Sequence, residues 1–421
     1  MNILIIGSGG REHAIAKALL RSASTRSVTC APGNAGIAAD VTCITLAGNP
    51  AIVDYCKTHA IDLVVVGPEQ PLVDGLADDL RAAGIAVFGP SAAGAQLEAS
   101  KDFTKKLCDK YAIPTARYAT FDNRTEAFEY IYKHGAPIVI KADGLAAGKG
   151  VTVAMTPREA VDAVDACFDG AFGKAGARVV IEEFMEGEEA SVFAICDGKT
   201  ATLFASAQDH KRVGDGDTGP NTGGMGTYSP TPIMTEAMNA RVMRDIITPT
   251  MNGLIADGIP YIGVLFAGLM LTKDGPKLIE YNARFGDPET QVMLARFDGD
   301  LAALLMSCAK GSIEPEHISF TPHPAICVVM ATKGYPGTFE KGSIIRGLDE
   351  AGAVAGVNIL HAGTAARDGE IISNGGRVLN IIATAPSIKE ARTRAYAAIE
   401  KIDWPEGFCR TDIAWRALAK K

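Results

Sequence analysis

Residues 280–291 read EYNARFGDPETQ and follow the largely apolar residues 277–279, a pattern typical of the end of a buried strand. Side chains two residues apart on a strand share a face, so Glu280 and Asn282 are expected to point the same way. A carboxylate and an amide oxygen are ligands that Mg²⁺ takes together with substrate phosphates. Arg284 shares that face if the strand continues, and its guanidinium could clamp a phosphate or a carboxylate. The segment predicts a magnesium site beside an anion site; a strand running into a polar turn is the simpler alternative for this segment alone.

Length and composition limit the class of protein. The chain has 421 residues, 47% hydrophobic and 21% charged, which predicts a globular enzyme of several units. Its net charge of −8, without a basic cluster, argues against a nucleic-acid partner. Apolar stretches such as residues 264–271 are too short to cross a bilayer, and the first residues lack the charged start of a signal peptide. The nine scattered cysteines favour reduced thiols, so we expect a cytoplasmic protein with no membrane partner.

The first hundred residues alternate short apolar runs with helical patterns. Runs at residues 3–6, 28–30, 63–66 and 86–88 are each followed by a turn rich in glycine or proline. Strands joined through helices form parallel sheets, and such sheets bind ligands at the carboxyl ends of their strands. The pattern predicts an N-terminal α/β unit with a ligand site along that edge.

The first of these turns contains Gly9 and Gly10 and partly resembles a dinucleotide-binding turn. Glu12 stands where the third glycine of that motif belongs, which disfavours a nicotinamide dehydrogenase. A glycine-rich turn before a helix can still hold one phosphate on free backbone N–H groups. We therefore favour a phosphorylated small molecule here over a purely structural turn.

The middle of the chain carries a second glycine-rich loop. Residues 137–141 are expected to form a strand that ends at Lys141, and the loop at residues 144–150 follows. The loop has neither the spacing nor the hydroxyl residue of a P-loop, so a flap that closes over phosphates is the better interpretation. Lys141 would then point at a nucleotide; a solvated strand end is the alternative.

Two further segments favour nucleotide chemistry. Residues 182–189 suggest a strand and hinge whose main chain contacts an adenine edge while Glu189 binds ribose, although an acidic surface turn would look similar. Residues 208–229 suggest a long polar loop in which Lys211 and Arg212 are followed by glycines. Cations near a metal carboxylate are what a transferring phosphoryl group needs.

In this order, the motifs resemble those of the glycinamide ribonucleotide synthetases (phosphoribosylamine–glycine ligases), a family of the ATP-grasp superfamily. The resemblance covers nearly the whole chain. It is carried by residues 9–14, 31–36, 66–69, 140–150, 208–212, 219–226, 284–291, 361–364 and 374–378.

The resemblance implies a multidomain α/β and α+β fold. It places an N-terminal parallel-sheet domain at residues 1–100, an ATP-grasp domain at 101–322 with a flap at about 120–187, and a small C-terminal α+β domain at 323–421. It also implies the reaction: ATP phosphorylates glycine, and the amine of 5-phosphoribosylamine attacks the glycyl phosphate, giving glycinamide ribonucleotide, ADP and phosphate in purine synthesis. ATP and Mg²⁺ (or Mn²⁺) would be required, and the enzyme would be a monomer or small homo-oligomer.

Roles for individual residues follow from the same resemblance. ATP would be bound by Lys101, Lys141, Gly148, Glu182, Met185 and Glu189. The metal would be held by Glu280 and Asn282. Phosphoryl or carboxylate charge would be neutralised by Lys211, Arg212 and Arg284. The substrates would be bound by Gly9, Gly10, Asn34, Glu69, Asp209, Asn221 and Asp287.

One position departs from the superfamily pattern. ATP-grasp relatives often carry a second acidic metal ligand on the preceding strand, whereas residues 267–269 here contain no acid. Two alternatives also stay open at this level: another ATP-grasp ligase or carboxylase using the same ATP site, and a nucleotide-binding protein without turnover. The intact set of Glu280, Asn282, Lys141 and Arg284 argues against the second.

Overall fold

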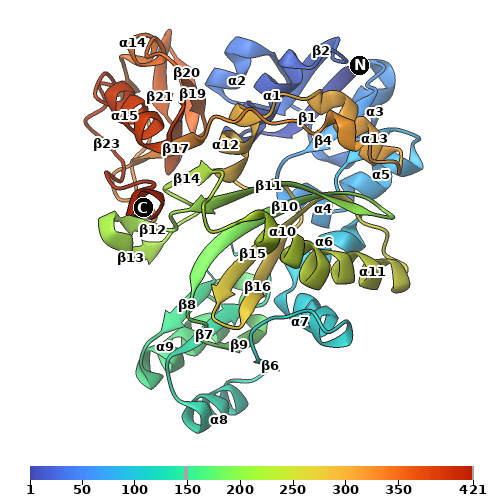
Figure 1. The fold of residues 1–421 in the computed structure, drawn as a ribbon, viewed down its shortest axis with the longest axis vertical. Coiled ribbons are helices and arrows are strands. Elements are labelled where there is room, and N and C mark those ends of the chain that lie inside the picture. The colour runs from blue at the N-terminus through green and yellow to red at the C-terminus, as the bar shows by residue number, and fades with distance from the viewer. Residues whose placement is uncertain (147–149, 420–421) are drawn as a thin grey trace.

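The computed structural model describes residues 1–146 and 150–419 of the chain. Figure 1 shows the N-terminal and C-terminal units side by side at one end of the molecule, a large twisted sheet in the middle, and a small helix-and-sheet flap at the opposite end. None of the helices within the described residues is long and apolar enough to span a membrane.

A five-stranded parallel sheet forms the N-terminal unit. Its order is β3-β2-β1-β4-β5, and β1 (Asn2–Gly7) pairs with both β2 (Ser27–Pro32) and β4 (Leu63–Val66). Every side chain of β4 is buried, as expected of a parallel strand covered on both faces. This confirms the predicted α/β fold of the unit. The other elements are β3 (Thr42–Cys43), β5 (Ala86–Phe88), α1 (Gly10–Arg21), α2 (Ala35–Asp40), α3 (Gly48–Thr58), α4 (Glu69–Val73), α5 (Leu76–Ala82) and α6 (Ala92–Ala99).

The flap is a four-stranded antiparallel sheet in the order β6-β9-β7-β8, with two helices packed against it. Its apolar residues form a core of their own, separate from the cores of the body. The preceding helix α7 (Lys101–Lys110) begins after Ser100, whose hydroxyl accepts the N–H of Phe103. The flap elements are β6 (Tyr118–Phe121), α8 (Arg124–His134), β7 (Ile138–Ala142), β8 (Val151–Ala154), α9 (Pro157–Phe168) and β9 (Val179–Glu183).

The central region is built on a nine-stranded sheet. Eight strands follow the order β16-β15-β10-β11-β14-β17-β22-β19, and β23 pairs with β17. The long neighbours at its first edge are antiparallel, and most of their residues are buried. The central elements are β10 (Glu188–Asp197), β11 (Ala201–Asp209), β14 (Gly226–Ser229), β15 (Ile262–Thr272), β16 (Gly275–Asn282), α10 (Glu236–Val242), α11 (Thr248–Ala256), α12 (Glu289–Arg296) and α13 (Leu301–Ala309).

The long loop expected at residues 208–229 contains regular structure. It holds a small hairpin of β12 (Arg212–Gly214) and β13 (Thr218–Asn221), and it ends in the buried strand β14. On one side β14 pairs with the end of β11, and on the other with β17 (Ala325–Thr332). The second partner lies far along the chain, so local sequence gave no sign of the strand.

The C-terminal unit continues the central sheet. Strand β17 pairs with β14 on one side and with β22 (Arg377–Thr384) on the other, so hydrogen bonding runs unbroken across the boundary expected at residue 322. The remaining elements are β18 (Ile344–Ile345), α14 (Leu348–Gly352), β19 (Val357–His361), β20 (Thr364–Arg367), β21 (Glu370–Ser373), α15 (Ile388–Ile399), β23 (Gly407–Phe408) and α16 (Trp415–Ala419).

Direct hydrogen bonds join the N-terminal and C-terminal units. The Asn34 side chain caps α2 and also donates to the carbonyls of His361 and Ala362, at 2.9 and 3.1 Å. The buried His13 accepts the backbone N–H of His361 at 2.9 Å. These contacts hold the carboxyl edge of the N-terminal sheet against β19.

Candidate active site

A cavity of about 470 Å³ lies where the flap, the central sheet and the N-terminal unit meet. Residues from all of these parts line it, and Arg377 adds a side chain from the C-terminal unit. The lining brings together most of the residues singled out from the sequence: Glu69, Lys101, Lys141, Glu182, Met185, Glu189, Asp209, Lys211, Asn221, Glu280, Asn282, Arg284 and Asp287.

Four other residues singled out from the sequence do not line this cavity: Gly9, Gly10, Asn34 and Arg212. The Arg212 guanidinium donates to the carbonyl of Gly219 at 2.7 Å within the hairpin. Gly148 lies outside the described residues.

Glu12 occupies the glycine-rich turn after β1. Its carboxylate accepts the N–H of Gly9 at 2.5 Å and the guanidinium of Arg11 at 2.5 Å. A Cβ atom at Gly67 would lie 1.9 Å from the carboxylate, so a side chain there would displace Glu12. The Gly9 N–H that we expected to be free for a phosphate is therefore already bound.

Glu280 and Asn282 lie together at the end of β16 and both line the cavity. Glu280 forms no ion pair with any described residue. Burial disfavours its charge, but Lys211 and then Lys141 outweigh that effect and lower the pKa of Glu280, so it is ionised at neutral pH. Gly268 stands opposite on β15, and residues 267–269 offer no second acid. An ionised carboxylate beside an amide oxygen fits a Mg²⁺ ion that takes few protein ligands.

Glu182 lies between two buried lysines. One carboxylate oxygen is 2.9 Å from Lys141 Nζ and the other is 3.1 Å from Lys105 Nζ, and all three side chains are at most 3% exposed. Lys141 also donates to the carbonyl of Ile279 at 3.0 Å, which ties the flap strand β7 to β16. The network fixes the ammonium groups of Lys105 and Lys141 where the flap meets β16.

Replacing Glu182 should destabilise the fold. The Glu182→Gln variant would remove the ion-pair partner of two buried ammonium groups, and we expect the free energy of unfolding to fall by about 3–5 kcal/mol. Urea titration followed by circular dichroism measures this. The neighbouring Glu183→Gln variant is the control: Glu183 pairs with the exposed Arg117, so we expect a loss below about 1 kcal/mol. Equal losses in the two variants would refute the interpretation.

Arg284 sits at the other side of the cavity between two carboxylates. Its Nε is 3.2 Å from Glu69 and its Nη2 is 2.8 Å from Glu98, which also accepts the N–H of Ala283 at 2.7 Å. Burial disfavours the charge of Arg284, but Glu98 and Glu69 outweigh it and raise the pKa of the guanidinium. Arg284 is thus a fixed cation whose ion pairs join α4 and α6 to the segment that follows β16.

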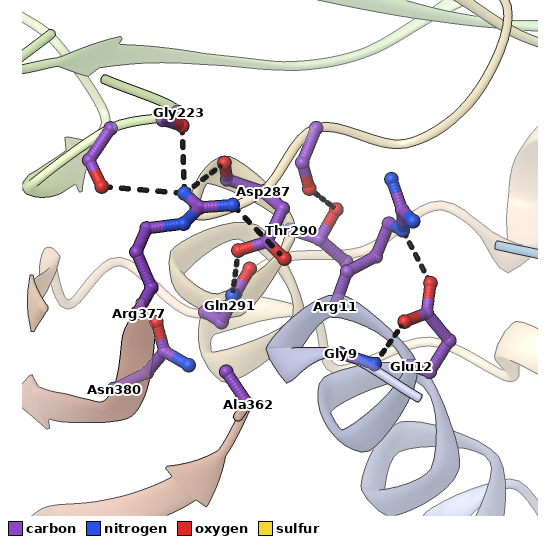
Figure 2. Close-up of polar contacts among 12 residues, drawn as sticks. Gly9, Arg11, Glu12, Gly223, Asp287, Thr290, Gln291, Ala362, Arg377 and Asn380 are labelled. Atoms are coloured by element: carbon purple, nitrogen blue, oxygen red, sulfur yellow. Dashed lines mark hydrogen bonds and ion pairs between the residues drawn. The ribbon is translucent and has the colours of Figure 1, made fainter. Parts of the chain in front are cut away.

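Arg377 of β22 joins the C-terminal unit to the site (Figure 2). Its Nη1 donates to the carbonyls of Gly223 and Asp287, both at 2.7 Å, and of Gly224 at 3.3 Å. Its Nη2 is 3.5 Å from the Asp287 carboxylate, which also accepts from Gln291 at 2.8 Å. Burial disfavours the charge of Asp287, but Arg377 and Arg11 outweigh it and lower the pKa of this carboxyl.

Comparison with known proteins assigns the family. Models of the phosphoribosylglycinamide synthetase N domain, ATP-grasp (A) domain and C domain match residues 1–98, 99–290 and 325–416. The chain belongs to the phosphoribosylglycinamide synthetase family. This confirms the resemblance seen in the sequence and makes the protein an ATP-dependent ligase with the ATP-grasp fold. Enzymes of that type bind ATP with a divalent metal ion.

Relatives of the phosphoribosylglycinamide synthetase family match the entire chain. A phosphoribosylamine–glycine ligase from Brucella melitensis biotype 1 is 58% identical over 100% of this chain and 99% of its own length. The crystal structure of a phosphoribosylamine–glycine ligase from Thermotoga maritima, 34% identical, covers 98% of this chain and 100% of its own, with a TM-score of 0.87. A biotin carboxylase from Campylobacter jejuni shares the fold at 15% identity, covering 96% of this chain and 92% of its own with a TM-score of 0.74.

The structure adds residues to this phosphoribosylglycinamide synthetase site that the sequence did not single out. They are Arg11, Glu98, Lys105, Glu289 and Arg377. Arg11, Glu289 and Arg377 lie within motifs that carried the family resemblance, so those motifs could have pointed to them. Glu98 and Lys105 lie in α6 and α7 without any local pattern, and only the packing of those helices against β16 brings them to the cavity.

Proposed function

We propose that this chain joins glycine to 5-phosphoribosylamine at the expense of ATP, giving glycinamide ribonucleotide, ADP and phosphate. The observation that carries the proposal is the match, over the full length of both chains, to enzymes named phosphoribosylamine–glycine ligase. The alternative of a binding protein without turnover is disfavoured by an ionised Glu280 surrounded by lysines in one cavity.

The chemistry needs positioning and charge neutralisation. A carboxylate is a poor acyl donor until phosphate becomes its leaving group, so the first step transfers a phosphoryl group from ATP to glycine. The amine of phosphoribosylamine then attacks the glycyl carbon and phosphate leaves. No protein nucleophile is required, since held reactants and compensated charge lower both barriers.

Residues of the central sheet and the flap serve the phosphoryl transfer. Glu280 and Asn282 would hold Mg²⁺ or Mn²⁺, which supplies Lewis-acid stabilisation of phosphate charge when bound. Charge on the transferring group would be neutralised by Lys211 and Arg284, which line the cavity. Arg212 would join them only after leaving its hydrogen bond to Gly219. ATP would be bound by Lys101, Lys141, Gly148, Glu182, Met185 and Glu189. Because both oxygens of Glu182 pair with lysines, its part would be to place those cations.

The substrates would occupy the side of the cavity formed by the N-terminal and C-terminal units. They would be bound by Glu69, Asp209, Asn221 and Asp287, which line the cavity. Gly9, Gly10 and Asn34 do not line it, so their part would be to shape the adjoining turns. Asp287 is ionised and held by Arg377, which suits an acceptor for hydroxyl or amine hydrogens. The side chain of Asn34 is saturated with backbone contacts, so its role would be to shape the turn.

The proposed reaction also indicates the partners and the cellular compartment of the protein. All partners would be small molecules, with neither nucleic acid nor membrane involved. The nine cysteines, all within the described residues, are free thiols, which supports a reducing cytoplasm. We propose a monomer or a small homo-oligomer.

Phosphate release from MgATP tests the proposed function. We expect release that depends on both glycine and freshly prepared 5-phosphoribosylamine, with glycinamide ribonucleotide detected by mass. Turnover only with another acid or amine would keep an ATP-grasp ligase and reject these substrates. No turnover in any mixture would reject the proposed reaction and support the alternative of a nucleotide-binding protein without turnover.

A further inference from the structure

The hairpin of β12 and β13 adjoins the cavity at both of its ends but has no core of its own. Lys211 directly precedes the hairpin and Asn221 ends it, and both residues line the cavity. No residue from 212 to 220 is buried, and within the described part of the chain the two strands pair only with each other. A two-stranded hairpin of that kind is marginally stable in water, so contacts from elsewhere in the protein hold it in place.

Residues 410–416 of the C-terminal unit supply such contacts, and Figure 1 shows this red segment beside the hairpin. The side chain of Arg410 is fully buried. Its Nη1 donates to the carbonyl of Arg212 at 3.0 Å and to the carboxylate of Asp217 at 2.9 Å. Asp217 also forms an ion pair with Arg416. Both strands of the hairpin and the turn between them are thus tied to the end of the chain.

The tip of the hairpin is bound to the same segment through backbone groups. The N–H of Thr411 donates to the Asp215 carboxylate at 2.8 Å, and the N–H of Gly216 donates to the Asp412 carboxylate at 2.9 Å. Asp412 in turn accepts two hydrogen bonds from Arg410, each 2.7 Å long. Two-point pairing of this kind fixes geometry as well as charge. The guanidinium of Arg410 is therefore the centre of the contact.

The same contacts reach the residues on either side of Lys211. The carbonyl of Arg212, which follows Lys211, is bound by Arg410. His210, which precedes Lys211, is completely buried, and its Nε2 accepts the N–H of Ala414 at 2.9 Å. Burial, followed by the charges of nearby arginines, lowers the pKa of His210 to about 3, so the ring is neutral and can accept this hydrogen bond.

Ala414 adopts a backbone conformation that favours glycine. Its φ is 67°, in the left-handed region, and the residue is fully buried. Residues other than glycine keep such a conformation only where the surrounding structure requires it. The hydrogen bond to His210 is one such requirement. The C-terminal segment therefore retains local strain where it contacts the residue before Lys211.

We infer that residues 410–416 position Lys211 for phosphoryl transfer, with Arg410 and Asp217 as the positioning residues. The inference rests on the proposed function, in which Lys211 neutralises charge on the transferring group. Neither Arg410 nor Asp217 lines the cavity, so both act through the backbone beside Lys211. The C-terminal unit then serves the phosphoryl-transfer step as well as the substrate side of the cavity, which it reaches through Arg377.

The Asp217→Asn and Arg410→Met variants test this inference through the first step of the reaction. Hydroxylamine can attack the glycyl phosphate in place of phosphoribosylamine, so that phosphate leaves and glycine hydroxamate forms. We expect kcat for hydroxamate formation to fall about ten- to thirtyfold in each variant, because charge neutralisation depends on the placement of Lys211. The KM for ATP should change less than about twofold. Asparagine tolerates the left-handed φ of 58° found at Asp217, so Asp217→Asn decides the test if Arg410→Met does not fold.

A double-mutant cycle distinguishes positioning of Lys211 from a general effect on the structure. Lys211→Met alone should lower kcat, and adding Asp217→Asn to it should lower kcat less than about twofold further. The control is Asp368→Asn, an exposed aspartate at a similar φ of 53° in the β20–β21 turn, which should behave like the parent chain. Full kcat in Asp217→Asn, or losses that multiply in the double variant, would overturn the inference. If the parent chain makes no hydroxamate from glycine, the proposed function itself fails.

Discussion

The Glu280→Gln variant should fold like the parent chain and turn over about a thousandfold more slowly. Glu280 is an ionised carboxylate beside Asn282 at the end of β16, and Gly268 opposite offers no replacement. The amide keeps the shape but removes the negative charge that holds a divalent cation against ATP phosphates. The measurements are kcat for phosphate release and the Mg²⁺ concentration that gives half-maximal rate, which we expect to rise.

The fold should not suffer from this change. Glu280 forms no ion pair among the described residues, and its neutral form removes a burial cost. A circular dichroism spectrum and thermal midpoint like those of the parent are expected. Asp274→Asn, an exposed acid in the turn of the same β15–β16 hairpin, is the matched control and should keep full activity. Normal turnover in Glu280→Gln would reject the metal assignment.

The Arg377→Met variant should lose about a hundredfold in kcat/KM for phosphoribosylamine. Arg377 contacts both the backbone carbonyl and the carboxylate of Asp287. Without Arg377 this carboxylate has no ion-pair partner among the described residues and is less well positioned on the side of the cavity where we place phosphoribosylamine. Formation of the hydroxamate from glycine, MgATP and hydroxylamine does not require phosphoribosylamine, so its rate should fall by only a few-fold. Product formation with varied phosphoribosylamine measures the first quantity.

Two further variants distinguish a loss of Asp287 positioning from a general loss of the folded structure. Arg377→Lys keeps the charge but loses the planar fork that reaches three carbonyl oxygens, so we expect an intermediate loss. Arg367→Met removes an exposed arginine of the same unit, which donates to Gly342, and should behave like the parent chain. Equal loss of hydroxamate formation and of product formation in Arg377→Met would show that the whole fold, and not the acceptor side, depends on Arg377.

Local sequence predicted the elements whose stability is local. The strand at residues 63–66 is an uninterrupted apolar run because both faces of a parallel sheet are covered, and period-two spacing placed Glu280 and Asn282 on one side of β16. Both are lining residues of the cavity.

Local sequence did not predict those strands and site residues whose interaction partners lie far along the chain. Strand β14 is short and polar, and it is stable because β17 pairs with it. Arg377 lies in one of the motifs that carried the family resemblance, but its local sequence does not show its contacts, which are the carbonyls of residues 223, 224 and 287. The glycine turn was misleading for the same reason, since only the folded chain shows Glu12 filling the space beside Gly67.

The unbroken sheet has a consequence for how this protein can be divided. A cut near residue 322 would separate β14 from β17, and each fragment would then expose one unpaired edge of a strand that is buried in the whole protein. Exposed edges of that kind pair with other chains and aggregate. The three family domains are therefore not three separable modules: an exchange of the C-terminal unit between relatives has to carry β14, or a compatible edge, with it. The flap differs, because its apolar residues form a core of their own.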